Sequence, residues 1–584
     1  MINRISDIPE NIYANLDYRH FLIQYEGNIS EEFKDIDGIY VTIINDKYAT
    51  LSVKIDLNYL DDEITYIRNI IERNNRRFDA ITYIKILEIY TLLQTTPKEA
   101  TNLKYIQNED SINLKGNGVV VGIIDTGIDY LNDEFIDDNG NTRINFIWDQ
   151  TIMDGKKTNL ETPYGSIFTK EKINMALQEH RKGGNPYDIV PSKDEIGHGT
   201  NMASLVGAKG KNDLLTGVAP NCEFAIVKLL EAISIKERFD IKIPTYNITS
   251  LFSALELLKN YALKESKPLV ILLPLGTSLG NHKGNSIMDK YIKSISINTG
   301  IVIVTGSGNE GNEGGHTSGL IQNVGDSKTI ELIISNEDKN LIVDFWIDLP
   351  NVVSINVISP SGEESGIMQS SIGSVDSFKF ILEETTVVSK EFIPEVFTGE
   401  QLIRIAMHNI RSGTWKFRLT LDKGSNATFN SWTFQSGIKS KNTRFFSSIP
   451  YGTITIPGDS AEIITAAAYN QENDNILNYS GMAFSELYLD RIDIAAGGKD
   501  ALAVGPNNRI DQLNGTSVSA AILAGACTLL FQWGIVRGNN PLLSSQNVKT
   551  YLTRGTRKRT GDIYPNPQWG YGMLDIYGIF KNLT

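Results

Sequence analysis

Three short segments, far apart in this chain of 584 residues, constrain the fold more than any other feature. The apolar run 119–124 ends on Asp125, His198 lies in Gly-His-Gly-Thr, and Ser517 lies in Asn-Gly-Thr-Ser. The first pattern is typical of a buried strand, and the other two are typical of the start of a helix. The chain order Asp, His, Ser is one of the orders in which unrelated folds assemble a Ser-His-Asp triad. The segments therefore predict an α/β fold in which strand and helix ends converge.

The three side chains have the chemistry that a nucleophilic hydrolase needs. The Ser517 hydroxyl is a weak nucleophile at neutral pH, so it requires a base, for which His198 is the candidate. Asp125 would hold the imidazole in one tautomer and stabilise the imidazolium. The apolar run 301–304 leads into a Gly-rich turn that presents Asn309. We expect the Asn309 amide and the Ser517 backbone N–H to form an oxyanion hole.

Each segment also has a simpler explanation when it is taken alone. An Asp after an apolar strand is more often a turn or cap residue, and a His between glycines can be a cap. Gly-Thr-Ser at a helix start is usually only an N-cap, and Gly308-Asn309 would ordinarily form a turn. The joint occurrence of all four segments in this order favours an assembled catalytic site.

Over about 95–315 and 447–580, these segments make the chain similar to the subtilisin-like serine peptidases, the subtilases. The resemblance implies serine endopeptidase activity, a catalytic domain built on a parallel sheet, and no required cofactor. It also implies that the segment after the apolar run 270–273 and the turn before Asn309 line the substrate cleft. These residues are Pro274, Leu275, Gly276, Thr277 and Gly308.

The chain departs from the subtilase pattern at three positions near these motifs. Asn201 stands where the family usually has a second His, and Ala521 stands where it usually has a Pro after the serine. Pro274 occupies the first position of the cleft-lining segment. None of these changes removes a catalytic group.

The first 94 residues precede the part that resembles a subtilase. Residues 22–25, 39–44 and 48–53 are expected to form strands, and 64–73 a helix. A small α+β unit in this place implies a prodomain, 1–94, that assists folding and inhibits the enzyme. Subtilases resembling this chain begin their mature part about thirty residues before the catalytic Asp, and Gln94 lies 31 residues before Asp125. We therefore expect self-cleavage between Gln94 and Thr95; an ordinary exposed linker is the alternative.

Residues 318–446 have a different pattern, with short alternating strands separated by turn signals. Examples of the expected strands are 329–335, 341–347, 353–358, 378–382 and 413–419. Regular spacing of this kind predicts a β-sandwich, which we interpret as an inserted jelly-roll domain. The catalytic domain would then consist of 95–317 and 447–584. An independent binding module on flexible hinges is the alternative.

Composition excludes several classes of function. The formal charge of −14, from 55 basic and 69 acidic residues, argues against a general nucleic-acid binder. No window reaches 18 uninterrupted apolar residues, so we expect no membrane span. The N-terminal residues have no apolar segment of the secretory type, so we expect no signal peptide. Cys222 and Cys527 lie in apolar contexts and are expected to be buried free thiols. We identify no run of oxygen ligands specific enough for a calcium site and assign no metal ligands, so calcium binding is left open.

The absent signal, the short prodomain, the inserted β domain and the run from Asn514 to Ile522 narrow the resemblance. The chain is similar to the Csp germination proteases of clostridial spores, and most to their catalytically competent, CspB-like members. This implies synthesis in the cytoplasm, residence in the spore coat or cortex region, and a cortex-hydrolase precursor of the SleC type as protein substrate. It also implies that the cleaved prodomain stays bound and that other Csp proteins are partners. A pseudoprotease or signalling scaffold, and a broad intracellular degradative subtilase, are the alternatives.

Overall fold

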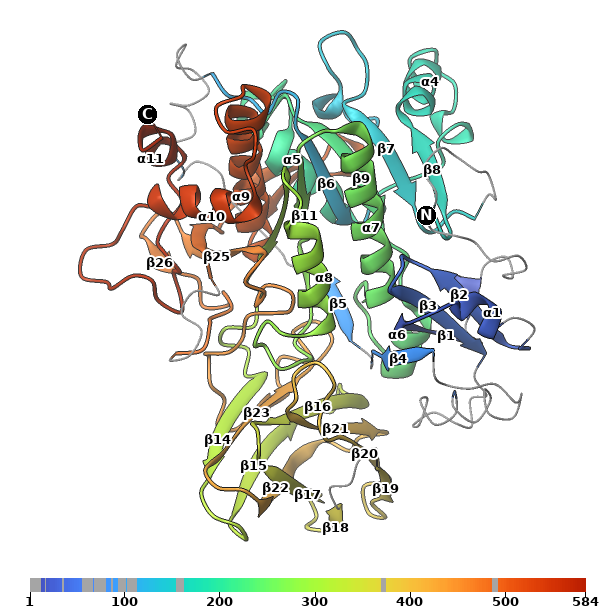
Figure 1. Ribbon diagram of the computed structural model, residues 1–584, viewed down its shortest axis with the longest axis vertical. Helices are drawn as coiled ribbons and strands as arrows, with labels where there is room; N and C mark the ends of the chain where they lie inside the picture. The colour runs from blue at the N-terminus through green and yellow to red at the C-terminus, as the bar shows by residue number, and fades with distance from the viewer. Residues whose placement is uncertain are drawn as a thin grey trace.

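A computed structural model describes residues 12–15, 17–33, 36–54, 67, 80–85, 88–92, 101, 113–153, 162–368, 374–485 and 492–583. Its centre is a nine-stranded sheet in the order β26-β25-β13-β11-β6-β9-β7-β8, with β27 paired to β25 (Figure 1). The strands are Val120–Asp125 (β6), Ile144–Asp149 (β7), Ser166–Thr169 (β8), Glu223–Lys228 (β9), Leu269–Leu272 (β11), Ile301–Gly306 (β13), Ile464–Asn470 (β25), Asn475–Ile476 (β26) and Ile494–Gly497 (β27). All pairings except β7–β8 and β25–β26 are parallel. The carboxyl ends of β6, β11 and β13 therefore lie at one edge of the sheet.

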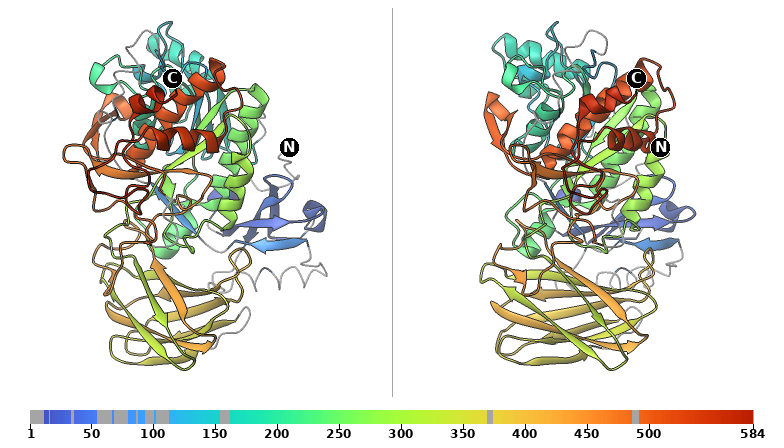
Figure 2. Two further views of the ribbon diagram at one scale, coloured as in Figure 1. Left: turned by 60° about the vertical axis from the view of Figure 1, so that its left-hand side comes forward. Right: turned by 90° about the vertical axis from the view of Figure 1, so that its left-hand side faces the viewer.

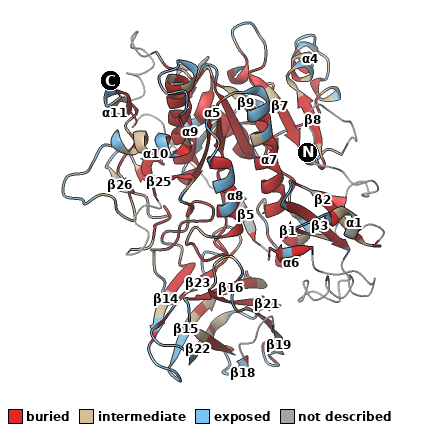
Figure 3. Cartoon of the chain, viewed as in Figure 1, coloured by how far each residue is buried: buried red, intermediate tan, exposed pale blue. Residues whose placement is uncertain are grey.

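Side chains of the central sheet alternate between two hydrophobic clusters, one on each face. In β6, Val121 and Ile123 join one cluster, and Val120 and Ile124 join the other. Helices on both faces bury the strands, which is why their sequences are continuous apolar runs (Figure 3). The first face packs against α4 (Lys170–Arg181), α5 (His198–Gly207), α9 (Thr516–Phe531), α10 (Ser545–Arg554) and α11 (Ile576–Lys581). The second face packs against α7 (Ile248–Glu265) and α8 (Ile287–Ser296).

All residues of helix α9 are buried. In the described part of the chain, Thr516–Val536 is the one helix long and apolar enough to cross a membrane, with a mean hydropathy of 1.7. However, 89% of that apolar window is buried inside the protein, so its composition is that of a core helix. Cys222 and Cys527 are both free and buried, as the sequence predicted. Burial raises the pKa of the Cys222 thiol to about 12.

The N-terminal part forms a four-stranded antiparallel sheet in the order β2-β3-β1-β4. Its strands are Tyr18–Tyr25 (β1), Ile39–Ile43 (β2), Tyr48–Lys54 (β3) and Ile81–Ile84 (β4). The three strands predicted before residue 54 are therefore present. A short helix, α1 (Ile29–Glu32), was not predicted. The predicted helix 64–73 lies almost wholly outside the described residues.

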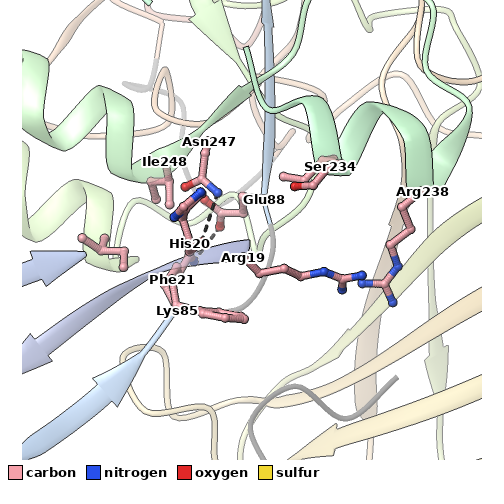
Figure 4. A pocket seen from close by; sticks show the side chains of 11 residues that line it. Arg19, His20, Phe21, Lys85, Glu88, Ser234, Arg238, Asn247 and Ile248 are labelled. Atoms are coloured by element: carbon pink, nitrogen blue, oxygen red, sulfur yellow. Dashed lines mark hydrogen bonds and ion pairs between the residues drawn. The ribbon is translucent and has the colours of Figure 1, made fainter. Parts of the chain in front are cut away.

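One face of this N-terminal sheet has its own cluster, and the other packs on the catalytic part (Figures 1 and 2). Tyr48 of β3 packs edge-on against Phe252 of α7 and Tyr291 of α8, each at 5.5 Å between ring centroids. A small hollow lies at the same junction, where Arg19 and Arg238 extend toward one another from the two sides (Figure 4). The Asn247 amide donates to the backbone oxygen of His20 at 3.1 Å beside it. The N-terminal sheet is thus docked by both apolar and polar contacts.

A short strand links the N-terminal sheet to the catalytic part. This strand, β5 (Ile89–Leu92), lies between β10 (Tyr246–Asn247) and β12 (Leu275–Gly276) and is antiparallel to both. Tyr90 pairs with Tyr246 on one side, and Leu92 pairs with Leu275 on the other. The chain therefore inserts its own strand between two edges of the catalytic part.

Residues 316–445 form two antiparallel sheets at one end of the molecule (Figure 2). One has the order β14-β23-β16-β21-β20-β19, and the other β18-β17-β22-β15-β24. Their strands are His316–Ile321 (β14), Ser327–Ile334 (β15), Asn340–Ile347 (β16), Val352–Ile358 (β17), Glu364–Met368 (β18), Val375–Lys379 (β19), Thr386–Phe392 (β20), Gln401–His408 (β21), Gly413–Lys423 (β22), Ala427–Thr433 (β23) and Arg444–Phe445 (β24). Residues of both sheets share one buried cluster. The expected domain boundaries and the jelly-roll topology stay predictions.

One expected strand in this region is wrong in extent. Residues 378–382 were expected to be a strand, but β19 ends at Lys379 and a turn follows. Phe380 is buried, whereas Ile381 and Leu382 have 77% and 64% of their surface exposed. Apolar composition alone suggested a continuing strand, but only one of these three side chains reaches the core.

Candidate active site

Asp125 and His198 are brought together by the end of β6 and the start of α5. His198 Nδ1 lies 2.8 Å from Asp125 Oδ2 and 2.9 Å from Oδ1, and both residues are buried. The approach is close because Gly199 has no side chain: a Cβ there would lie 2.2 Å from the Gly127 backbone oxygen. The Thr126 N–H also donates to Asp125 Oδ1 at 2.7 Å. This carboxylate is thus placed to orient the imidazole through Nδ1.

Ser517 is the second residue of α9, a helix that packs against α5 in the first cluster. Its hydroxyl oxygen is buried and makes no hydrogen bond within the described part of the chain. Catalytic hydrogen bonds are often incomplete before substrate binds, so this geometry is compatible with a nucleophile at rest. The hydrogen bond from Ser517 to His198 stays a prediction. The Ser517 N–H belongs to the first turn of α9, where backbone donors have no intrahelical acceptor.

Asn309 lies three residues beyond β13 and contacts the start of α9. Its Oδ1 accepts hydrogen bonds from the backbone N–H of Thr516 at 3.1 Å and from the Thr516 hydroxyl at 3.2 Å. These contacts hold the Asn309 side chain next to the residue that precedes Ser517. A glycine is again required for the approach, since a Cβ on Gly306 would lie 2.6 Å from the Thr516 backbone oxygen. The arrangement suits an amide that donates to an oxyanion formed on a substrate carbonyl.

A cleft of about 380 Å³ opens beside Asn309. Asn514, Thr455 and Tyr479 line it with Asn309, and Ile196, Ile243 and Pro244 supply apolar surface. Thr455 packs tightly under two glycines: a Cβ on Gly276 or Gly308 would lie 2.3 or 2.5 Å from its hydroxyl. The cleft is thus large enough for part of a peptide and is bounded by the candidate oxyanion donor.

The predicted cleft segment pairs with a strand from the N-terminal part of the same chain. Leu275 and Gly276 form β12 and pair with β5, so the chain itself lies along this edge. Thr277 pairs with Ile456 through two backbone hydrogen bonds of 2.9 and 3.0 Å. Pro274 is buried between β11 and β12, where its missing N–H removes no sheet hydrogen bond of those two strands. Gly308, with φ of +88°, makes the turn before Asn309.

The other two departures from the family pattern are accommodated locally. The Asn201 amide donates to the backbone oxygen of Val504 at 2.9 Å and to Asp511 at 3.0 Å, which ties α5 to the hairpin of β28 (Ala501–Val504) and β29 (Ile510–Leu513). Ala521 is buried within the continuous helix α9. Neither change displaces Asp125, His198 or Ser517 from its element.

One wall of the cleft was not predicted from sequence. It is the connector 435–441, which lies between β23 and β24 and contributes Gln435, Ser436, Gly437 and Lys441 to the lining. The backbone N–H and hydroxyl of Ser436 donate to Glu310 at 3.0–3.1 Å. Burial raises the pKa of Glu310, while Lys439 and Ser436 counteract that rise. The sequence alone does not indicate this wall of the cleft, because Ser436 and Glu310 lie 126 residues apart in the chain.

Two remaining expectations concern residues or ligands beyond these contacts. Gln94 and Thr95, the expected self-cleavage site, lie outside the described residues, although the described strand β5 ends two residues before Gln94. Among the described residues, no group of three or more His, Cys, Asp or Glu side chains is arranged to hold a metal ion.

Comparison with known proteins shows similarity to a family and to individual proteins of that kind. The subtilase family model matches residues 116–377 and 442–572. The solved structure of the Clostridium perfringens CspB protease superposes with a TM-score of 0.73 at 31% identity, covering 83% of this chain and 96% of that one. The subtilisin-like protease SBT6.1 of Arabidopsis thaliana is 26% identical over 139 residues, which are 23% of this chain but only 13% of the plant protein.

Proposed function

Because the chain belongs to the subtilase family and is a subtilisin-like serine peptidase, we propose that it acts by limited proteolysis. It cuts itself once near Gln94, and it then cuts the inactive precursor of a spore cortex-lytic enzyme, a SleC-like protein, when germination begins. The protein would act in the spore and would require no cofactor. Its partners would be its own cleaved N-terminal part and other Csp proteins. The similarity to the CspB protease supports this assignment.

The observation that carries the proposal is the position of β5. A peptide that adds a strand to exposed edges gains main-chain hydrogen bonds, as peptide ligands of many proteins do. Here the strand belongs to the same chain and ends shortly before Gln94. A cut near Gln94 would thus fall shortly after a strand that is already held between two edges of the catalytic part.

A cut near Gln94 would leave the N-terminal part in place. The N-terminal sheet packs on α7 and α8 through its own buried aromatic residues. A product strand held next to its site by such a second interface has a high effective concentration there. Most protein substrates would be excluded, and the enzyme would act on few targets.

The self-cleavage is tested by comparing wild type with Ser517→Ala. Wild type should run as two fragments on a denaturing gel, with Thr95 as the new N-terminus by sequencing, and Ser517→Ala should run as one. Gel filtration without denaturant should keep both wild-type fragments together. An uncut chain in active wild-type protein would contradict the self-cleavage, and separation of the fragments would contradict retention.

The choice of substrate is tested with two proteins and one probe. A purified SleC-type precursor should be cut at one position, whereas casein should remain largely intact. Extensive digestion of casein would favour a broad degradative enzyme. A fluorophosphonate probe should label wild type but not Ser517→Ala, and the absence of labelling would favour a signalling scaffold.

A further inference from the structure

A buried carboxylate outside the predicted triad contacts the segments that carry Asp125 and His198. Asp194 precedes His198 by four residues, and only 4% of its surface is exposed. Its Oδ1 accepts from the Thr126 hydroxyl at 2.8 Å and from the Gly197 N–H at 2.7 Å. Its Oδ2 accepts from the Thr200 N–H at 2.9 Å and from the Thr200 hydroxyl at 2.6 Å. Each carboxylate oxygen thus has two donors.

The donors of Asp194 belong to opposite sides of the Asp125–His198 contact. Thr126 directly follows Asp125, and its hydroxyl also accepts from the Gly199 N–H at 2.9 Å. Gly197 and Thr200 flank His198 at the start of α5. Asp194 therefore joins the end of β6 to the first turn of α5 through one buried group.

Helix α5 needs such a group at its start. Its N-cap is Gly197, with φ of +95°, and glycine supplies no side-chain cap. The first N–H groups of a helix have no intrahelical acceptor, and an anion there is favoured by the helix dipole. Asp194 accepts two of these N–H groups from outside the helix. The carboxylate thus fixes the helix end on which His198 lies.

We propose that Asp194 is a positioning residue for the peptidase reaction. It does not touch the reacting atoms; it sets the distance and angle between the Asp125 carboxylate and the His198 imidazole through Thr126, Gly197 and Thr200. An amide cannot replace it, because its NH2 group would face two donors on one side. This role does not depend on which protein substrate the enzyme cuts.

The test compares Asp194→Asn with Glu134→Gln. Glu134 is a matched control, since its carboxylate is also buried and accepts backbone N–H groups, in this case from Gly210, Lys211 and Asn212 at 2.7–3.2 Å. We expect Asp194→Asn to react with a fluorophosphonate probe about 10²-fold more slowly than wild type per folded molecule, because misplacement of a catalytic group has effects of this order. For a short peptide substrate, kcat should fall by a similar factor while KM stays unchanged. Glu134→Gln should keep the wild-type labelling rate.

A second pair of variants keeps the test decisive if Asp194→Asn folds poorly. Thr126→Val removes the hydroxyl that joins Asp194 to β6, and Thr126→Ser retains it. Labelling should be slow in the valine variant and recover in the serine variant, with thermal unfolding measured for both. Equal labelling rates in all folded variants, or losses that follow the unfolded fraction alone, would overturn the positioning role. Because the probe needs no protein substrate, these outcomes are independent of the proposed precursor.

Discussion

At the scale of single residues, the candidate site contains buried polar groups with hydrogen-bond partners and one buried polar group without a partner in the described part of the chain. The carboxylates of Asp125 and Asp194 are buried and accept several hydrogen bonds each. The Ser517 hydroxyl, in contrast, is buried without a hydrogen-bond partner among the described residues. A buried polar group in this state costs about 1–3 kcal/mol. The nucleophile is therefore the group at which stability and function oppose each other.

Ser517→Ala should therefore change activity and stability in opposite directions. Loss of the nucleophile should lower turnover by a factor on the order of 10⁶. Removal of the unsatisfied hydroxyl should raise the free energy of unfolding by about 1 kcal/mol. Peptide hydrolysis and urea unfolding of the same preparations measure the two effects. Near-normal turnover would remove Ser517 from the site, and a lower unfolding free energy would show that its hydroxyl has a stabilising partner.

Two glycines with the same backbone angle offer a test of the turn before Asn309. Gly308 and Gly183 have φ of +88° and +83°, but only at Gly308 would a Cβ be crowded, at 2.5 Å from Thr455. Gly183→Ala should cost about 1–2 kcal/mol of unfolding free energy, the conformational term alone. Gly308→Ala should cost more and should also slow probe labelling by displacing Asn309. Equal effects of the two variants on stability and labelling would refute the crowding argument.

At the scale of elements, the junction of the antiparallel sheets with the catalytic part contains two buried imidazoles. His316 of β14 and His282 both stack on Trp432 of β23, at 4.7 and 4.3 Å between ring centroids. Burial lowers the pKa of His316 to about 4, with His282 adding to the effect. Both rings are thus held neutral where the two parts of the molecule meet.

This junction should weaken in acid. The pKa of His316 is 6.5 in the unfolded chain and about 4 in the folded protein, so between these values the unfolded state binds more protons. Stability from this group is complete above pH 6.5 and is lost as the pH falls toward 4, by about 3 kcal/mol in all. His316→Gln should lose less unfolding free energy than wild type over this range in urea titrations. Parallel pH profiles for the two proteins would contradict the assignment.

Elements whose signals are local could be predicted from the sequence, and contacts between distant segments could not. The apolar run before Asp125 and the glycines beside His198 fix a strand end and a helix start by their own pattern. The connector 435–441 has no such local pattern. Its place at the site depends on hydrogen bonds of Gln435 with Gly276 and Ser278, which lie more than 150 residues away in the chain. Asp194 was missed for a different reason: an acidic residue in a loop has no distinctive periodicity, and only the fold shows its four donors.

At the scale of the whole molecule, the three parts contact one another at several places. The cluster of the antiparallel sheets extends into Ile235 and Phe239 of α6 (Ile233–Phe239). The Tyr83 hydroxyl of the N-terminal sheet donates to Glu395 at 3.0 Å, and its ring packs on Phe397 at 4.3 Å. The antiparallel sheets are thus attached to both other parts rather than to the catalytic part alone.

These contacts predict that the antiparallel sheets do not move as a separate module. We expect limited proteolysis with proteinase K, which needs no basic residue, to leave the regions around 318 and 446 uncut while the rest of the protein remains folded. A protease cuts only where the backbone opens locally. The buried contacts of rings, carboxylates and amides at the junctions oppose such opening. Rapid cutting near both positions, with release of a stable fragment of roughly 130 residues, would instead favour an independent domain on hinges.

The strand β5 also constrains how such a protein can diverge. Residues 89–92 pair with the edges of β10 and β12. Under the proposed function, an incoming peptide would use the same edges. A mutation that alters either edge changes the fit of the internal strand and of the external target at once. Under the proposed function, a change of target would therefore require a matching change in residues 89–92. To transfer substrate specificity from one relative to another, residues 89–92 would then have to be exchanged together with the edges of β10 and β12 that face them.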